Sequence, residues 1–192
     1  INDLSTGCVA ALSDDINEPD TIGLISVNSP VTCFGTNDGS SIISLSGGTG
    51  SLIPTWSIIV PGNGLNISDT NQTSLSGGEY KIVVVDDNNC KDSINVIINE
   101  PDTILSNGVV SDVSCYSYTD GTIDVVLSGG NPVLTFNWSS SDATFIDPGT
   151  TSLTNLNAGD YFLSVVDDKN CTYDTTITIN APAEILLLAT LN

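Results

Sequence analysis

The residues of this chain with the most chemical potential are its cysteines and the aspartates of several short acidic turns. The cysteines are Cys8, Cys33, Cys90, Cys115 and Cys171. Zinc sites built on cysteine use closely spaced pairs of thiols, often together with histidine. The chain has no histidine and no Cys-x-x-Cys pair. The spacing of the thiols therefore argues against a zinc site.

The acidic turns offer oxygen ligands for a metal ion. VVVDDNNC and SVVDDKNC carry paired carboxylates, and TNDGS and YTDGT carry single ones. Ca²⁺ prefers such oxygens, so structural calcium is the only cofactor that the sequence suggests. The same residues are also ordinary in turns, and no spaced ligand series like that of an EF-hand is present. The candidate ligands are Asp38, Asp86, Asp87, Asp120, Asp167 and Asp168.

An internal repeat organises the chain. The hexapeptide NEPDTI occurs at residues 17–22 and again at 99–104. An offset of 82 residues carries Cys33 onto Cys115, and an offset of 81 carries Cys90 onto Cys171. Such self-similarity predicts a tandem array. We expect two complete repeats at 20–101 and 102–182, with 1–19 as the C-terminal strand of a preceding repeat and 183–192 as the first strand of a following one.

Each repeat has the pattern of short β-strands separated by polar turns. GTIDVVLSGG is a β-rich run closed by a glycine pair, and YKIVVV alternates apolar residues on one face. No long window shows helical periodicity. About seven such strands per repeat predict an all-β fold of tandem, immunoglobulin-like Greek-key β-sandwich domains stacked end to end.

Four aromatic residues are expected in the cores of these sandwiches rather than in a ligand site. Two tyrosines belong to a Leu-x-x-Gly-x-Tyr motif, which is typical of a tyrosine corner. Two tryptophans lie where the third strand places its core aromatic. These residues are Trp56, Tyr80, Trp138 and Tyr161.

The charge of the chain excludes several classes of partner. Twenty-three acidic residues against three basic ones give a net charge of −20. Nucleic-acid binding needs a basic face, and an anionic membrane surface would repel the chain. No apolar run reaches the roughly 18–20 residues of a membrane span. We therefore expect no nucleic-acid partner and no membrane insertion.

The assembled motifs resemble the SprB-type repeats of Bacteroidetes cell-surface proteins, which include the gliding-motility adhesins. The matching elements in the first repeat are CFGTNDG at 33–39, the glycine pair, the Trp, Gly-x-Tyr, and Val-x-Asp-x-x-x-Cys ending at Cys90. The second repeat departs at Ser117, where the first has Gly35. The resemblance covers both repeats. It implies an extracellular protein at the cell surface, exported by the type IX system and displayed as a filament of stacked sandwiches.

Cysteines of a secreted protein favour disulfides. Pairing within each repeat is the first expectation, but the two loops concerned lie at opposite poles of an immunoglobulin-type fold. That separation is about 25–30 Å, far beyond the ~7 Å between Cα atoms that a disulfide spans. End-to-end stacking would allow pairing between repeats, and pairing in sequence order is the third alternative. The three registers are Cys33–Cys90 with Cys115–Cys171, Cys33–Cys171, and Cys8–Cys33 with Cys90–Cys115.

The resemblance also suggests O-glycosylation, because these bacteria attach O-glycans at Asp-Ser/Thr followed by a small or aliphatic residue. Such triplets recur near the repeat junctions. The candidate sites are Thr21, Ser93, Thr103 and Thr175.

The sequence thus predicts a structural and adhesive segment of a long extracellular surface filament, whose partners are neighbouring repeats of the same chain. The alternative is a carbohydrate- or ligand-binding module of a secreted multidomain protein, with Phe34 and Phe145 as candidate contact residues. We expect no enzyme: paired carboxylates can act as acid and base, but here they recur in both repeats, as scaffolding does.

Overall fold

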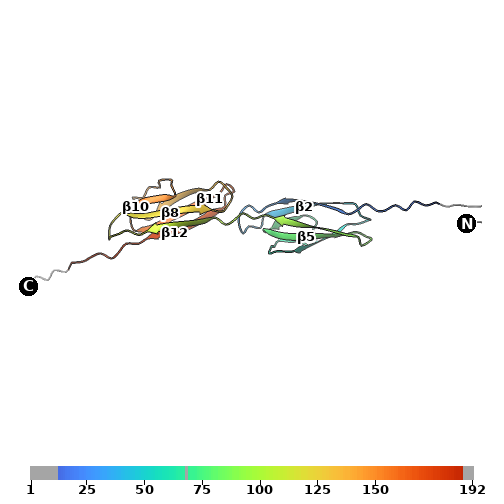
Figure 1. Cartoon of the computed structure of the whole chain (residues 1–192), viewed down its shortest axis with the longest axis horizontal. Helices are drawn as coiled ribbons and strands as arrows, with labels where there is room; N and C mark the ends of the chain where they lie inside the picture. Colours follow the sequence, from blue (N-terminus) through green and yellow to red (C-terminus); the bar gives the residue numbers. More distant parts are fainter. Residues whose placement is uncertain (1–12, 68, 188–192) are drawn as a thin grey trace, which may run out of the picture.

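A computed structural model describes residues 13–67 and 69–187, and this part of the chain contains β-strands and no helix. Accordingly, no described helix could cross a membrane. The strands form two groups that lie end to end along an elongated molecule (Figure 1). The N-terminal sandwich contains β1 Gly23–Ser29, β2 Gly39–Ser46, β3 Ile53–Ile58, β4 Gln72–Leu75, β5 Gly78–Val85 and β6 Lys91–Ile98. The C-terminal sandwich contains β7 Leu105–Ser111, β8 Gly121–Ser128, β9 Thr135–Ser140, β10 Ser152–Leu156, β11 Gly159–Val166 and β12 Thr172–Ile179.

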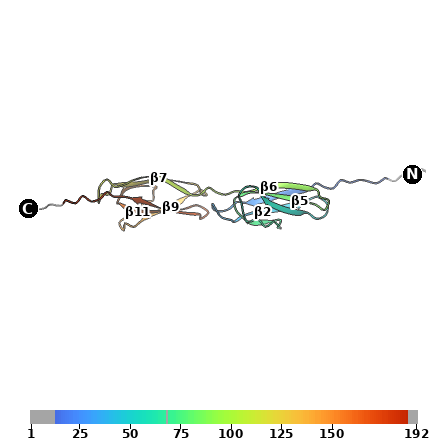
Figure 2. The ribbon, with the colours of Figure 1, turned by 90° about the horizontal axis from the view of Figure 1, so that it is seen from below.

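Each group is a sandwich of two three-stranded antiparallel sheets (Figure 2). The sheets have the orders β1-β2-β4 and β3-β5-β6 in the first sandwich, and β7-β8-β10 and β9-β11-β12 in the second. This confirms the predicted all-β, immunoglobulin-like fold. The prediction of about seven strands per repeat was wrong, because six form. The segments 59–67, 69–71 and 141–151, which lack strand alternation, run as turns, bends and irregular chain.

Each sandwich has its own core. Trp56 packs in the first with Tyr80, and Trp138 packs in the second with Tyr161; all four side chains are buried. The alternation predicted for β5 is present, since Ile82 and the other inward-facing residues of this strand are fully buried. Two separate apolar interiors make two independently packed units.

The buried tyrosines form tyrosine corners. The Tyr161 hydroxyl donates to the carbonyl of Asn157 at 3.0 Å. The Tyr80 hydroxyl lies 2.9 Å from the carbonyl of Ser76 and 3.0 Å from that of Asn63. Each ring therefore fills the core while its hydroxyl ties down the connection that precedes its strand.

We expect Tyr161→Phe to lower the free energy of unfolding by about 1 kcal/mol, because the phenyl ring still fills the core but the Asn157 carbonyl loses its donor. Urea unfolding of the C-terminal sandwich measures the change. Tyr118→Phe is the matched control, since the Tyr118 side chain is exposed and its hydroxyl secures no buried carbonyl. Equal effects of the two substitutions would contradict the role of the corner.

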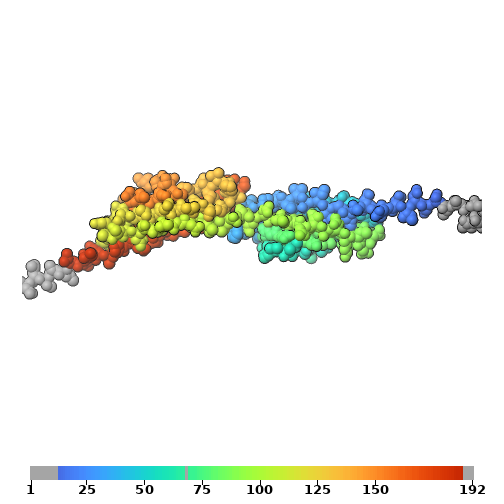
Figure 3. Space-filling view, in the orientation of Figure 1, coloured from blue at the N-terminus to red at the C-terminus, as the bar shows by residue number. Residues whose placement is uncertain are grey.

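The linker between the sandwiches is held at both ends. The Val31 N–H donates to the Asn99 carbonyl at 3.1 Å, and the Gly130 N–H donates to the Asp102 carbonyl at 2.8 Å. Ile104 then enters the second core. The first NEPDTI copy makes the equivalent contact with its own sandwich, because the Gly48 N–H donates to the Asp20 carbonyl at 2.9 Å. Little slack is left between the sandwiches, which form one continuous rod (Figure 3).

The expected partial strands at the two ends of the chain are not seen in its described part. Residues 13–19 and 183–187 carry no strand. A strand needs a hydrogen-bonded neighbour, and no described segment pairs with these residues. Residues 1–12, which include Cys8, and residues 188–192 lie outside the described residues.

Candidate functional site

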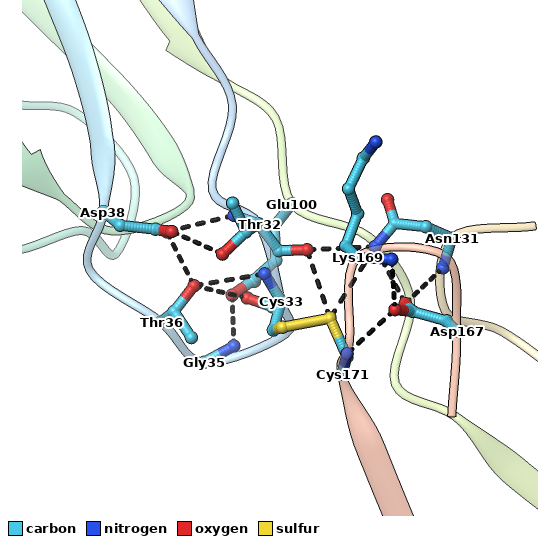
Figure 4. Close-up of a disulfide and its surroundings, with 10 residues drawn as sticks. All are labelled: Thr32, Cys33, Gly35, Thr36, Asp38, Glu100, Asn131, Asp167, Lys169 and Cys171. Carbon is cyan, nitrogen blue, oxygen red and sulfur yellow. Dashed lines mark hydrogen bonds between the residues drawn. A yellow bond between two sulfur atoms is a disulfide. The ribbon is translucent and has the colours of Figure 1, made fainter. Parts of the chain in front are cut away.

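The junction between the sandwiches is the site where the chemistry-bearing residues converge. The β1–β2 loop carries Cys33 at one pole of the N-terminal sandwich, and Cys171 lies directly before β12. These two cysteines form a disulfide with 5.6 Å between their Cα atoms and a sequence separation of 138 residues (Figure 4). One covalent bond therefore joins the two sandwiches directly.

The first expectation for the disulfides, Cys33–Cys90 with Cys115–Cys171, was wrong, and so was the register in sequence order. Cys90 and Cys115 are both free and exposed. Cys90 precedes β6, whereas the Cys33 loop is fixed next to Asn99, which follows β6. The eight residues of this strand hold the two thiols roughly 25 Å apart. The alternative between repeats, Cys33–Cys171, is the one that forms.

Asp167 shapes the turn that presents Cys171. One carboxylate oxygen accepts the backbone N–H groups of Lys169 at 2.8 Å and Cys171 at 2.9 Å. The other accepts the backbone N–H of Asn131 at 2.8 Å and its side-chain amide at 2.9 Å. Burial by itself would raise the pKa of Asp167, but these hydrogen bonds outweigh burial and lower the pKa to about 2.

Asn131 links the two sandwiches beside the disulfide. Its side-chain amide also donates to the carbonyl of Thr32 at 2.9 Å, across the junction (Figure 4). On the other side, the N–H and hydroxyl of Thr32 both donate to Asp38. The hydrogen bonds from Thr32, with a further one from Thr36, lower the pKa of Asp38 to about 2. The Gly35 N–H donates to Glu100 at 2.7 Å, which secures the tip of the loop.

A hollow of about 320 Å³ lies beside the disulfide. Phe34, adjacent to Cys33, contributes to its wall, together with the linker from Pro101 to Ile104 and the start of β12. Phe34 is 58% exposed. Phe145, the other aromatic considered for ligand contact, is partly buried against the second core, where it packs edge-on against Tyr161 with ring centroids 5.4 Å apart.

The predicted calcium ligands are distributed over separate turns. Asp86 accepts N–H groups from Thr49, Asn88 and Cys90, and Asp120 accepts from Ser114. Asp87 and Asp168 are exposed. Among the described residues, no group of three or more Asp, Glu, Cys or His is arranged to hold a metal ion. Calcium binding stays a prediction.

The candidate glycosylation sites divide by their surroundings. Thr21 and Thr103 are exposed next to the glycine turns of their own sandwiches, and Ser93 is exposed on β6. Thr175 is half-buried on β12. Modification of these residues remains a prediction.

Comparison with known proteins identifies the repeat. Residues 107–143 match the family model described as SprB repeat. The chain carries an SprB repeat. No curated protein matches the sequence significantly.

Solved structures similar to the chain include two that are described as containing Ig domains and one fragment of intimin. The N-terminal eight Ig domains of Down Syndrome Cell Adhesion Molecule are 12% identical, with a TM-score of 0.42, over 86% of this chain and 25% of that one. Dpr11 IG1 bound to DIP-gamma IG+IG2 is 13% identical, with a TM-score of 0.39, over 84% of this chain and 98% of that one. A 282-residue C-terminal intimin fragment, in complex with the intimin-binding domain of its translocated receptor, is 17% identical, with a TM-score of 0.38, over 85% of this chain and 65% of that one. This chain thus spans a quarter of the length of the first of these structures.

The SprB repeat contributes Asn131 to the junction, a residue that the sequence analysis missed. Its counterpart in the first repeat, by the offset of 82, is Thr49. A position that differs between repeats gives no periodic signal. Asn131 directly follows the glycine pair, at the pole that faces the neighbouring sandwich, and this location was the signal that could have identified it.

We expect the buried carboxylate of Asp167, in the C-terminal sandwich, to make stability sensitive to acid. The folded-state pKa of Asp167 lies below the ordinary value of 3.8. Its contribution is therefore complete above about pH 4 and is lost as the pH falls toward 2. Urea unfolding between pH 5 and pH 2 should show falling stability. Asp167→Asn should be less stable at pH 5 and should lose less between pH 4 and 2; an unchanged acid dependence would contradict this assignment.

Proposed function

We propose that this chain is a structural segment of a long extracellular surface filament or adhesin built from tandem β-sandwich repeats. The observation that carries the proposal is the Cys33–Cys171 disulfide, which joins consecutive sandwiches across their junction. SprB repeats occur in cell-surface proteins, and disulfides persist in oxidising, extracellular surroundings.

The position of the disulfide suits a protein that is pulled along its length. Tension entering from the N-terminal side reaches Cys33 after β1, crosses the disulfide to Cys171, and leaves through β12. Most of both sandwiches is outside this covalent path. Force applied to the ends can therefore detach the outer strands, but it cannot extend the enclosed chain.

Two further properties support a filament. The linker is held by hydrogen bonds on both sides and is accompanied by the Asn131–Thr32 contact, so the junction resists bending. The net charge of −20 keeps parallel filaments soluble and mutually repelling. Export by the type IX system, a part in gliding motility and O-glycosylation belong to the same proposal, and their support is the likeness to SprB repeats.

Immunogold electron microscopy tests the proposal. Antibodies raised against this chain should label fibres outside intact cells that produce the protein, without permeabilisation. Deleting one internal repeat from the gene should shorten the fibres by one axial repeat. Label that appears only after permeabilisation, or only on compact surface particles, would overturn the proposal.

A further inference from the structure

We propose that Cys90 and Cys115 are the two halves of a second covalent junction, through which further copies of this sandwich module join end to end. Cys115 would bond to the Cys90 position of the next copy. The occupant of each half is thus another module of the same kind. The inference rests on the end-to-end stacking in the proposed function and adds the residues and chemistry that would extend it.

The first support is that the repeat-related counterparts of these two cysteines bond to each other in this structure. Cys115 is the counterpart of Cys33, and Cys90 is the counterpart of Cys171. The Cys33–Cys171 bond shows directly what the two positions do when a neighbouring module is present. Cys90 and Cys115 remain free and exposed at the outer poles of the two sandwiches.

The loop that carries Cys115 has the geometry of the bonded Cys33 loop. The N–H and hydroxyl of Ser114 donate to Asp120 at 2.9 and 2.6 Å, as those of Thr32 do to Asp38. The Tyr118 N–H donates to the Cys115 carbonyl at 3.1 Å, and the Thr36 N–H donates to the Cys33 carbonyl at the same distance. This loop therefore holds its thiol in the bonding conformation without a partner.

The turn that carries Cys90 likewise matches the bonded Cys171 turn. The Asp86 N–H donates to the Cys90 carbonyl at 3.1 Å, and an Asp86 carboxylate oxygen accepts the Cys90 N–H at 2.8 Å. The corresponding distances for Asp167 and Cys171 are 3.0 and 2.9 Å. The preceding asparagine has φ of 65° in both turns. Formation of the disulfide would require no rearrangement of either half, which limits the ordering cost of association.

A recess that could receive a neighbouring loop is also duplicated. Cys90 opens onto a hollow of about 430 Å³, lined by residues equivalent to those beside Cys171, among them Pro19, Ile22 and Gly48. At the existing junction, Phe34 next to Cys33 forms part of the wall of the hollow. Tyr116, next to Cys115, is 51% exposed and occupies the same place in its loop. The geometry thus assigns Tyr116 to the Cys90 hollow of the next module.

The bond requires removal of two electrons and two protons, which a small-molecule disulfide such as oxidised glutathione accepts. The Cys90 thiolate attacks the glutathione disulfide, which forms a mixed disulfide and releases one glutathione. The Cys115 thiolate of another copy then attacks the Cys90 sulfur, which forms the intermodular bond and releases the second glutathione.

The test uses the purified chain with Cys8→Ser, so that only Cys90 and Cys115 are free, in a glutathione redox buffer at high protein concentration. We expect a ladder of oligomers on non-reducing gels, with peptide mapping that finds Cys90–Cys115 as the dominant new link and Cys33–Cys171 retained. Cys90→Ser and Cys115→Ser should each abolish the ladder beyond dimers. Tyr116→Ser should slow formation of the mixed link, whereas Tyr118→Ser, a change of another exposed tyrosine in the same loop, should not.

Other outcomes would overturn the inference. Symmetric Cys90–Cys90 and Cys115–Cys115 links in amounts expected from random encounter would mean that no complementary docking exists. Persistence of both thiols, or their capture only as glutathione adducts, would have the same meaning. With Cys33–Cys171 intact, such a result leaves the filament proposal to its own test by immunolabelling.

Discussion

Pulling the oxidised chain by its two ends is expected to release far less length than pulling the reduced chain. The disulfide bridges a sequence separation of 138 residues, which at 3.3–3.6 Å per residue corresponds to roughly 450–500 Å of extended chain. This length is inaccessible to force while the bond is intact, because tension passes from Cys33 to Cys171. Single-molecule force spectroscopy with and without a reductant measures the difference as the total gain in contour length.

The double substitution Cys33→Ser with Cys171→Ser is the control for this experiment. It should extend to the full length even under oxidising conditions, and added reductant should change nothing. Cys90→Ser, which removes a free thiol, should retain the restricted extension of the parent chain. Full extension of the oxidised parent chain would show that the disulfide does not carry the tension.

A single methyl group added at Gly129 is expected to be the most damaging small change in the C-terminal sandwich. Gly129 has φ of +77°, and a Cβ atom there would lie 1.9 Å from the carbonyl oxygen of Thr103. Backbone atoms must therefore move, and the linker that they belong to would lose its contact with the glycine turn. We expect Gly129→Ala to lower the free energy of unfolding by about 3 kcal/mol or more, at the upper end of ordinary substitutions.

Gly149→Ala separates the effect of the clash from that of backbone conformation. Gly149 also has a positive φ, of +68°, but nothing lies within 4 Å of an added Cβ atom. Its substitution should cost only the 1–2 kcal/mol or so of a left-handed alanine. Urea or thermal unfolding of both variants measures the difference. Similar losses would mean that close contact between the glycine turn and the linker does not matter.

The sequence by itself determined the repeat, the all-β class, the sandwich fold and the core aromatics. These features are local and periodic. The alternation in YKIVVV predicts which face of β5 is buried. The Leu-x-x-Gly-x-Tyr motif predicts which tyrosine hydroxyl donates a hydrogen bond to the preceding connection. Because the two repeats differ at many positions but keep Trp56 and Trp138 in register, the shared residues reveal the packing that both need.

The number of strands was less well predicted. The segments 59–71 and 141–151 are polar and rich in turn-forming residues, and their lack of alternation was a signal against a seventh strand. The immunoglobulin template favoured one nonetheless. Local composition was the better guide in this case.

Only the tertiary structure decided how the cysteines pair and what the acidic turns do. Disulfide pairing depends on which poles meet when two sandwiches stack. Cys33 is farther in sequence from its partner, Cys171, than from Cys90 or Cys115. A carboxylate such as Asp167 can bind a cation or cap its own turn, and both roles require the same residue type. The positions of the surrounding N–H groups show that Asp167 caps its turn. Sequence periodicity records what each module needs to fold, whereas contacts between modules depend on distances in space that periodicity does not encode.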